Sequence, residues 1–144
     1  NAALGIAMEF FRLGADHEFV EISLPNKVEP EGWFRSLVRI MVGEFVGNST
    51  VYLEISELTD FHKDLIKMHE SVSGVAELNT LERQIVLKLV ANGRGAIDVE
   101  GILWSHATYG SRLNFEFKID QTYLNEELPK LGRWIQRQNH GGAA

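Results

Sequence analysis

Apolar and polar residues alternate along most of the second half of the chain. In residues 81–91, Gln84 and Lys88 fall on one face of an extended chain. The other face carries the apolar residues Leu81, Ile85, Leu87, Leu89 and Ala91. A period of two is typical of a β-strand with one face buried. The alternation resumes in residues 97–103 and again in residues 113–119. The pattern therefore predicts a fold built mainly from β-sheet.

Residues that form tight turns separate these three segments. Asn92 and Gly93 follow the first segment, and residues 108–111 follow the second. Asparagine and glycine tolerate the positive φ angles of a β-hairpin turn. We therefore expect three consecutive strands joined in an antiparallel meander.

The first half of the chain has the composition of further strands. Residues 37–46 and 50–55 predict a second hairpin, with its turn at residues 47–49. Two shorter runs before it, residues 10–13 and 19–24, also have strand composition. Strands are therefore expected in the first half of the chain as well as in the second.

Two stretches show the spacing of an α-helix. The first begins at Ser56, which we expect to be its N-cap, and ends at Gly74. Its apolar stripe consists of Leu58, Phe61, Leu65, Met68 and Val72. The second helix lies near the C-terminus, with a stripe of Leu124, Leu128, Leu131 and Ile135. We expect Asn125 or Glu126 to be its N-cap, because Pro129 then lies in or beside the first turn, where its missing N–H costs little.

The order strands, helix, strands, helix predicts an α+β fold. We expect a curved antiparallel sheet of about eight strands in meander hairpins, with one helix mid-chain and one at the C-terminus. So many strands favour a strongly curved sheet, a half-barrel or a sandwich over a flat sheet. Residues 8–140 form the expected single domain. Residues 1–7 are expected to be a leader outside the fold, and residues 141–144 a disordered tail.

The composition excludes several classes of site. The 144 residues contain no cysteine, so disulfides, thiolate metal sites and cysteine nucleophiles are excluded. A formal net charge of −6 argues against a protein that binds nucleic acid, because phosphate contacts need a basic face. No apolar run approaches the length of a membrane span. We therefore expect an acidic cytoplasmic protein that binds neither nucleic acid nor membrane.

The histidines do not have the spacing of a metal site. His62 and His69 lie on one face of the first predicted helix, but they are two turns, about 10 Å, apart. Two ligands of one zinc ion lie much closer together, because each Zn–N bond is only about 2.1 Å long. We interpret this helix face as solvated, and we expect neither a metal nor another cofactor.

Asp98 and Glu100 are the strongest candidates for acid–base catalysis. They project from the same face of one predicted strand, about 7 Å apart. Any strand with an exposed polar face has the same geometry. We therefore interpret the two carboxylates as part of an ordinary solvent-exposed face rather than as a catalytic pair. Ser105 and His106 are adjacent, so their side chains should point to opposite faces of a strand, and the serine lies in no nucleophile elbow. We therefore expect no enzymatic activity.

Aromatic and apolar residues indicate a binding surface instead. Ile102 and Trp104 share the polar face of a strand whose other face is already apolar. Either a helix covers them or they form an exposed patch for a partner. Trp33 and Tyr109 either seal the edges of the core or anchor a protein interface. The candidate interface consists of Trp104, Ile102, Asp98, Glu100, Trp33 and Tyr109.

Residues 53–131 resemble the WapI family of small bacterial immunity proteins. The shared features are a strand that runs into a helix at residues 53–58, Leu-Glu-Ile-Ser-Glu-Leu, and the apolar hairpin 85–103. A third feature is Asp-Gln-Thr-Tyr-Leu, residues 120–124, ahead of the last helix. The resemblance implies a protein that binds and neutralises a polymorphic toxin. It assigns no site residue.

Three hypotheses follow, from different classes of protein. The first is a non-enzymatic bacterial protein-binding domain, an immunity protein whose acidic charge suits a basic toxin. The second is a small-ligand carrier or enzyme with a pocket between the curved sheet and the C-terminal helix. That pocket would be lined by Trp104, Phe115, Phe117 and Trp134. The third is an oligomerising module that associates through a sheet edge or through the face of Trp104.

Overall fold

The computed structural model of the chain describes residues 9–107 and 109–143, the last four of them as backbone only. In chain order the elements are β1 (Glu9–Ala15), β2 (Glu18–Leu24), β3 (Trp33–Val42), β4 (Phe45–Glu54), α1 (Ile55–Ser71), β5 (Ser73–Asn79), β6 (Ile85–Asn92), β7 (Ala96–His106), β8 (Tyr109–Asp120) and α2 (Leu124–Ala143). This order confirms the predicted α+β fold, with antiparallel strands, one helix mid-chain and one at the C-terminus. The predicted leader, residues 1–7, lies outside the described residues, and the limits of the single domain stay a prediction. The helix α2 is described as far as Ala143, which includes most of the expected tail.

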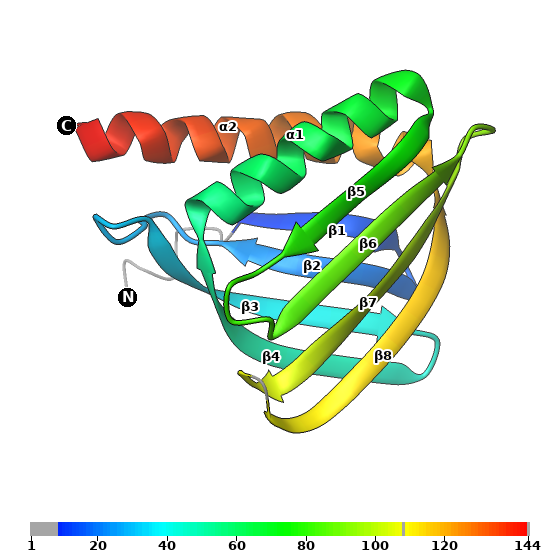
Figure 1. Cartoon of the computed structure of the whole chain (residues 1–144), viewed down its shortest axis with the longest axis horizontal. Helices are drawn as coiled ribbons and strands as arrows, with labels where there is room; N and C mark the ends of the chain where they lie inside the picture. Colours follow the sequence, from blue (N-terminus) through cyan, green and yellow to red (C-terminus); the bar gives the residue numbers. More distant parts are fainter. Residues whose placement is uncertain (1–8, 108, 144) are drawn as a thin grey trace.

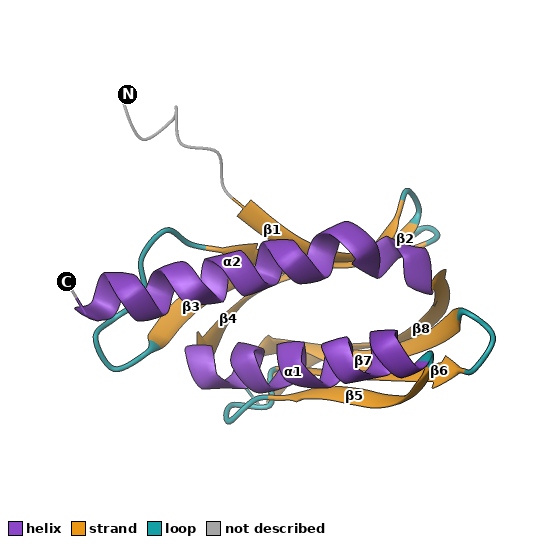
Figure 2. Ribbon diagram, turned by 90° about the horizontal axis from the view of Figure 1, so that it is seen from above, coloured by secondary structure: helices purple, strands orange, loops and turns teal. Residues whose placement is uncertain are grey.

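The eight strands form two sheets, each a four-stranded antiparallel meander. Sheet A has the strand order β1-β2-β3-β4 and sheet B the order β5-β6-β7-β8, and α1 joins the two sheets (Figure 1). The sheets face each other, and the two helices lie along one open side (Figure 2). The helix α1 packs against β5, and α2 packs against β1 and α1. The sheets do not join into a closed barrel.

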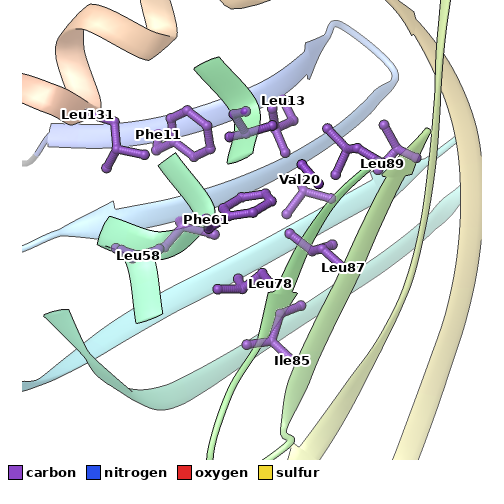
Figure 3. Packing of buried hydrophobic residues seen from close by; sticks show 14 of the residues in the cluster. Phe11, Leu13, Val20, Leu58, Phe61, Leu78, Ile85, Leu87, Leu89 and Leu131 are labelled. Carbon is purple, nitrogen blue, oxygen red and sulfur yellow. The ribbon is translucent and has the colours of Figure 1, made fainter. Parts of the chain in front are cut away.

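The hydrophobic core lies between the two sheets and beneath the helices. Alternate residues of the strands point inward, so that Val20 of sheet A and Leu87 of sheet B belong to one cluster (Figure 3). Phe61 of α1 reaches the same cluster and meets the ring of Phe11 edge-on, with 6.4 Å between the ring centroids. Leu131 brings α2 into the cluster. The predicted strand alternation and the predicted helix stripes therefore supply most of the core.

The strand predicted over residues 81–91 begins later than expected. The strand β6 starts at Ile85, and Leu81 lies in the preceding turn with 75% of its surface exposed. The Arg83 N–H donates to Thr80 O at 3.0 Å, and Thr80 Oγ1 donates to Ile85 O at 3.0 Å. These two bonds close the turn. The residues before it form β5, a strand that the sequence analysis did not assign.

The turn of the first long hairpin also lies earlier than predicted. The strands β3 and β4 are joined at Gly43 and Glu44, where Gly43 has a φ of 63°. Gly47, which we expected in the turn, lies inside β4. A Cβ atom at Gly47 would come within 2.8 Å of Leu113 Cδ2 in sheet B. This glycine therefore serves the close approach of the two sheets and not the turn.

The helix α1 begins one residue before the predicted cap. Its N-cap is Glu54 rather than Ser56, and the Glu54 N–H donates to Glu57 Oε1 at 2.8 Å. The helix ends at Ser71, because Val72 takes a left-handed conformation with a φ of 59°. The chain then enters β5 directly.

The helix α2 begins at Leu124, earlier than predicted, so that Pro129 lies inside it. A 3-10 turn precedes the helix, and its cap is Asp120, whose carboxylate accepts a hydrogen bond from the Thr122 N–H at 2.9 Å. This bond favours the charged carboxylate and therefore lowers the pKa of Asp120. The capped 3-10 turn replaces the helix start that we had assigned beside the proline.

Candidate functional site

Four of the predicted interface residues share one outer face of sheet B. Asp98, Glu100, Ile102 and Trp104 alternate along β7 and point away from the core, whereas Leu103 between them is buried. The strand β7 lies between β6 and β8, so this surface has neighbours on both sides. We call the surface around these four side chains the β7 face.

Charged and apolar rows follow one another across the β7 face. Glu100 pairs with Lys88 of β6 and with Glu116 of β8. Two residues further along β7, Ile102 pairs with Val86 of β6. An apolar row is therefore bordered by a row that carries two carboxylates.

A shallow hollow of about 490 Å³ lies over these rows. Its lining residues are Glu77, Val86, Lys88, Glu100, Gly101, Ile102, Asn114, Phe115 and Glu116. Three of them carry a carboxylate and only one carries an amine. The hollow therefore favours a positively charged group that is attached to an apolar side chain.

Trp104 lies where the β7 face meets the seam between the two sheets. Its indole is half buried, and the guanidinium carbon of Arg112 lies 5.2 Å from the ring centroid. The backbone N–H of Trp104 donates to Gln84 O at 2.8 Å. Gln84, which we expected on the solvent side of a strand, is buried, and its Nε2 donates to Ser49 Oγ at 2.7 Å. These bonds fasten the backbone of Trp104 to sheet A.

The two carboxylates that we considered for catalysis lie in water. Asp98 and Glu100 are both exposed, and Asp98 Oδ1 lies 3.7 Å from Lys118 Nζ. A general acid needs a desolvated setting that separates its pKa from that of its partner. Asp98 and Glu100 are both exposed, so the pair does not have this setting.

Ser105 and His106 do not point to opposite faces as predicted. A β-bulge between Trp104 and His106 shifts the register, and Ser105 Oγ lies 3.1 Å from His106 Nδ1. The same hydroxyl accepts a hydrogen bond from the Ser111 N–H at 2.9 Å. The pair is exposed and stabilises the end of the β7–β8 hairpin.

The remaining two predicted interface residues are separated by the fold. Tyr109 begins β8 beside the bulge, is 62% exposed, and stacks on His106 with 4.6 Å between ring centroids. It therefore lies beside the end of β7 that carries Trp104. Trp33 lies on the outer side of sheet A, stacked on Tyr52 at 5.1 Å. The Tyr52 hydroxyl donates to Glu29 Oε1 at 2.8 Å, and this bond raises the pKa of Tyr52.

The two helix histidines face the second helix, although we expected them to face solvent. His62 Nε2 lies 2.9 Å from Leu128 O, and His69 Nε2 lies 2.9 Å from Asn125 Oδ1. A Cβ atom at Gly132 would come within 3.2 Å of the His62 ring, so the glycine permits this close packing. The histidines therefore fasten α1 to α2. Among the described residues no group of three or more side chains is placed to hold a metal ion.

The four aromatic residues of the predicted ligand pocket do not converge. Trp104 is on the outer face of β7, whereas Phe115 and Phe117 point to the inner face of β8. Trp134 is fully buried and packs edge-to-face on Phe34 of sheet A, with 5.2 Å between centroids. The core thus fills the space that the small-ligand hypothesis required for these residues.

A group of arginines on sheet A escaped the sequence analysis. Arg35 and Arg39 alternate with buried residues along β3, and the pairing of β1, β2 and β3 brings Arg12 to the same outer face. The alternation along β3 was a visible signal. The position of Arg12 depends on strand pairing that the pattern alone does not contain.

Comparisons with known proteins identify a family and a fold. The model of the family described as "Immunity protein WapI-like family" matches residues 10–138. No curated protein matches the chain. A solved structure described as a guideRNA-binding protein complex bound to a gRNA contains a chain with a TM-score of 0.58 and 11% sequence identity, with 100% of each chain covered. At this identity the likeness concerns the fold alone. No helix in the described part of the chain is long and apolar enough to span a membrane.

Proposed function

Because the chain belongs to the WapI-like immunity protein family, we propose that it protects a bacterial cell by binding a protein toxin in the cytoplasm, without catalysing a reaction. Membership supports an immunity role in general. Binding of the toxin, its surface chemistry and the place of contact are parts of the proposal.

The contact surface in this proposal is the β7 face. The observation that carries it is the hollow over Ile102 and Val86, which three carboxylates border. An apolar centre with charged surroundings is the usual anatomy of a protein interface. The carboxylates suit a toxin with a basic surface, because opposite charges accelerate the encounter.

Trp104 is the proposed anchor of the contact. Tryptophan is among the residues that most often dominate binding energy, especially where the ring is already partly buried. The guanidinium carbon of Arg112 lies 5.2 Å from the centroid of the Trp104 ring, and this contact restricts the Trp104 side chain before binding. Arg112 and Tyr109 flank this end of the face.

The proposal is tested by co-expressing the chain with the toxin domain encoded by a neighbouring gene and measuring growth and complex formation. The wild-type chain should restore growth and bind the purified toxin domain. Trp104→Ala should weaken binding by about 2 kcal/mol, roughly thirtyfold, measured by calorimetry. The matched control is Trp33→Ala on sheet A, which should leave the affinity unchanged.

Two results contradict the proposal. The first is that the chain neither binds the toxin nor protects against it, which would show that the proposed function is wrong. The second result is that Trp104→Ala binds the toxin as tightly as the wild-type chain, whereas Trp33→Ala binds it more weakly. The proposed function would then stand, but the contact surface would be on sheet A.

A further inference from the structure

The two sheets lie on opposite sides of the core, so the outer face of sheet A points away from the β7 face (Figure 2). This outer face carries a second cluster of side chains. It consists of Arg12, Phe19, Arg35, Leu37, Arg39 and Val46. We call this surface the arginine face. Strand pairing assembles it, because Glu21 of β2 pairs with Arg12 of β1 and with Arg39 of β3.

Phe19 holds two of the arginines in place. Its ring is only 4% exposed although it lies on the outer face of the sheet. The guanidinium carbon of Arg12 lies 4.0 Å from the ring centroid, and that of Arg39 lies 5.9 Å from it. Such cation–π contacts order a side chain before any partner arrives. An ordered arginine loses less conformational entropy on binding.

Exposed apolar side chains lie beside these arginines. Leu37 is 46% exposed and Val46 is 50% exposed. The strands β1 to β4 contain arginines on this face and no lysine. Protein interfaces are enriched in arginine and aromatic residues and depleted in lysine. The arginine face has that composition more clearly than the β7 face.

The charge of the arginine face is opposite to that of the whole chain. The chain carries a formal charge of −6, whereas this face combines three arginines with Glu21. Arg12 Nε lies 3.8 Å from Glu21 Oε2. In the described part of the chain, neither Arg35 nor Arg39 forms an ion pair. Both are exposed and keep their charge available to a partner.

We propose that the arginine face is a second binding surface, which takes an extended protein segment with carboxylates on either side of an apolar side chain. Arg35, Leu37 and Arg39 alternate along β3, so the two arginines stand about 13 Å apart with the leucine midway. A segment with acidic residues four positions apart and an apolar residue midway has the same spacing when it is extended. Each carboxylate can then accept a charge-assisted hydrogen bond from one guanidinium group.

Other occupants fit the arginine face less well. A second copy of the chain in a two-fold arrangement would place the same arginines against each other. Nucleic acid needs a longer run of cations than the three arginines of this face provide. Both remain as outcomes of the test.

The test uses the full chain, labelled with nitrogen-15, and a short synthetic peptide with two glutamates four positions apart and a leucine midway. We expect amide shifts confined to β2, β3 and β4, and an affinity that falls as ionic strength rises. Arg35→Glu should weaken binding at least about tenfold. Because Arg35 is exposed and makes no aromatic contact in the described structure, this variant should fold normally, which circular dichroism checks.

Matched controls separate this surface from the β7 face. Lys118→Glu makes the same kind of charge change on sheet B and should leave peptide affinity unchanged. Trp104→Ala should also leave it unchanged, so the result does not depend on whether a toxin binds the β7 face. A peptide with lysines in place of the glutamates should not bind.

The proposal is overturned by equal binding of the lysine peptide or by amide shifts on sheet B. It is also overturned if a short single-stranded RNA binds more tightly than the glutamate peptide, or if the chain forms concentration-dependent dimers that Arg35→Glu abolishes. Absence of any shift with the glutamate peptide overturns it as well.

Discussion

The two sheets have the same topology but hold their surface charges in different ways. On sheet B, Lys118 and Asp98 approach to 3.7 Å with 79% and 57% of their side chains exposed. On sheet A, the guanidinium group of Arg12 lies over the ring of Phe19 and forms an ion pair with Glu21. The side chain of Arg12 is 37% exposed, and that of Glu21 is 16% exposed. The Lys118–Asp98 pair of sheet B is therefore largely independent of the packing beneath it. The Arg12–Glu21 pair of sheet A is part of the packing around Phe19.

The helices also differ in how they hold the two sheets. The helix α1 is continuous with β4 and leads through one residue into β5, so the chain itself fastens it to both sheets. The helix α2 reaches sheet A through side chains. Trp134 is fully buried against Phe34, and its Nε1–H donates to Pro25 O at 2.7 Å. Glu127 Oε1 accepts a hydrogen bond from the Arg12 N–H at 2.8 Å.

The largest expected effect follows from this asymmetry. Trp134→Ala should lower the free energy of unfolding by about 3–5 kcal/mol, because it leaves a cavity between α2 and sheet A. We expect hydrogen exchange to accelerate in β1, β2 and β3 before it accelerates in β6, β7 and β8. Trp134→Phe keeps a ring but leaves Pro25 O without its donor, and should cost about 1–3 kcal/mol. Equal loss of protection in both sheets would show that α2 holds them equally.

The alternation of residues predicted much of sheet B but could not position its seam with sheet A. The strands β6, β7 and β8 and the shared face of Asp98 to Trp104 follow from a period of two, which depends only on local geometry. The true position of Gly47 depends on Leu113, which belongs to the other sheet. A glycine in a sequence does not show whether it serves a turn or a close contact.

The candidate surfaces divide in the same way. Trp33 and Trp104 were grouped as aromatic candidates, but they belong to different sheets, and only tertiary structure separates them. The arginine face was missed because Arg12 and Arg39 meet around Phe19 only after three strands pair. Local patterns therefore predict which residues share a strand face, and strand pairing decides which faces become surfaces.

A buried glutamine, Gln84, lies at the seam between the two sheets. Gln84 Nε2 lies 2.7 Å from Ser49 Oγ and 3.1 Å from both Thr50 O and Trp104 O, and its side chain links sheet A to sheet B. Gln84→Leu should lower the free energy of unfolding by about 1–3 kcal/mol, because buried acceptors lose their donor. Urea denaturation measures this loss, and Glu77→Gln on the exposed face is the control. Unlike Trp134→Ala, this change should accelerate amide hydrogen exchange in β4 and β7 together. A loss confined to one sheet would mean that Gln84 does not link the two.

The smallest expected effects compare the two surfaces directly. Arg12→Ala should lower the free energy of unfolding by about 1 kcal/mol, because it removes a cation–π contact and uncovers the ring of Phe19. Lys118→Ala should change it by less than about 0.5 kcal/mol, because an exposed ion pair contributes little. Urea denaturation at low and high salt measures both. The Arg12 effect should persist in high salt, since packing is not screened, whereas any Lys118 effect should vanish. If the two variants lose equal stability, the charges of sheet A are no more coupled to packing than those of sheet B. That result would mean that packing does not order the side chains of the arginine face before a partner binds.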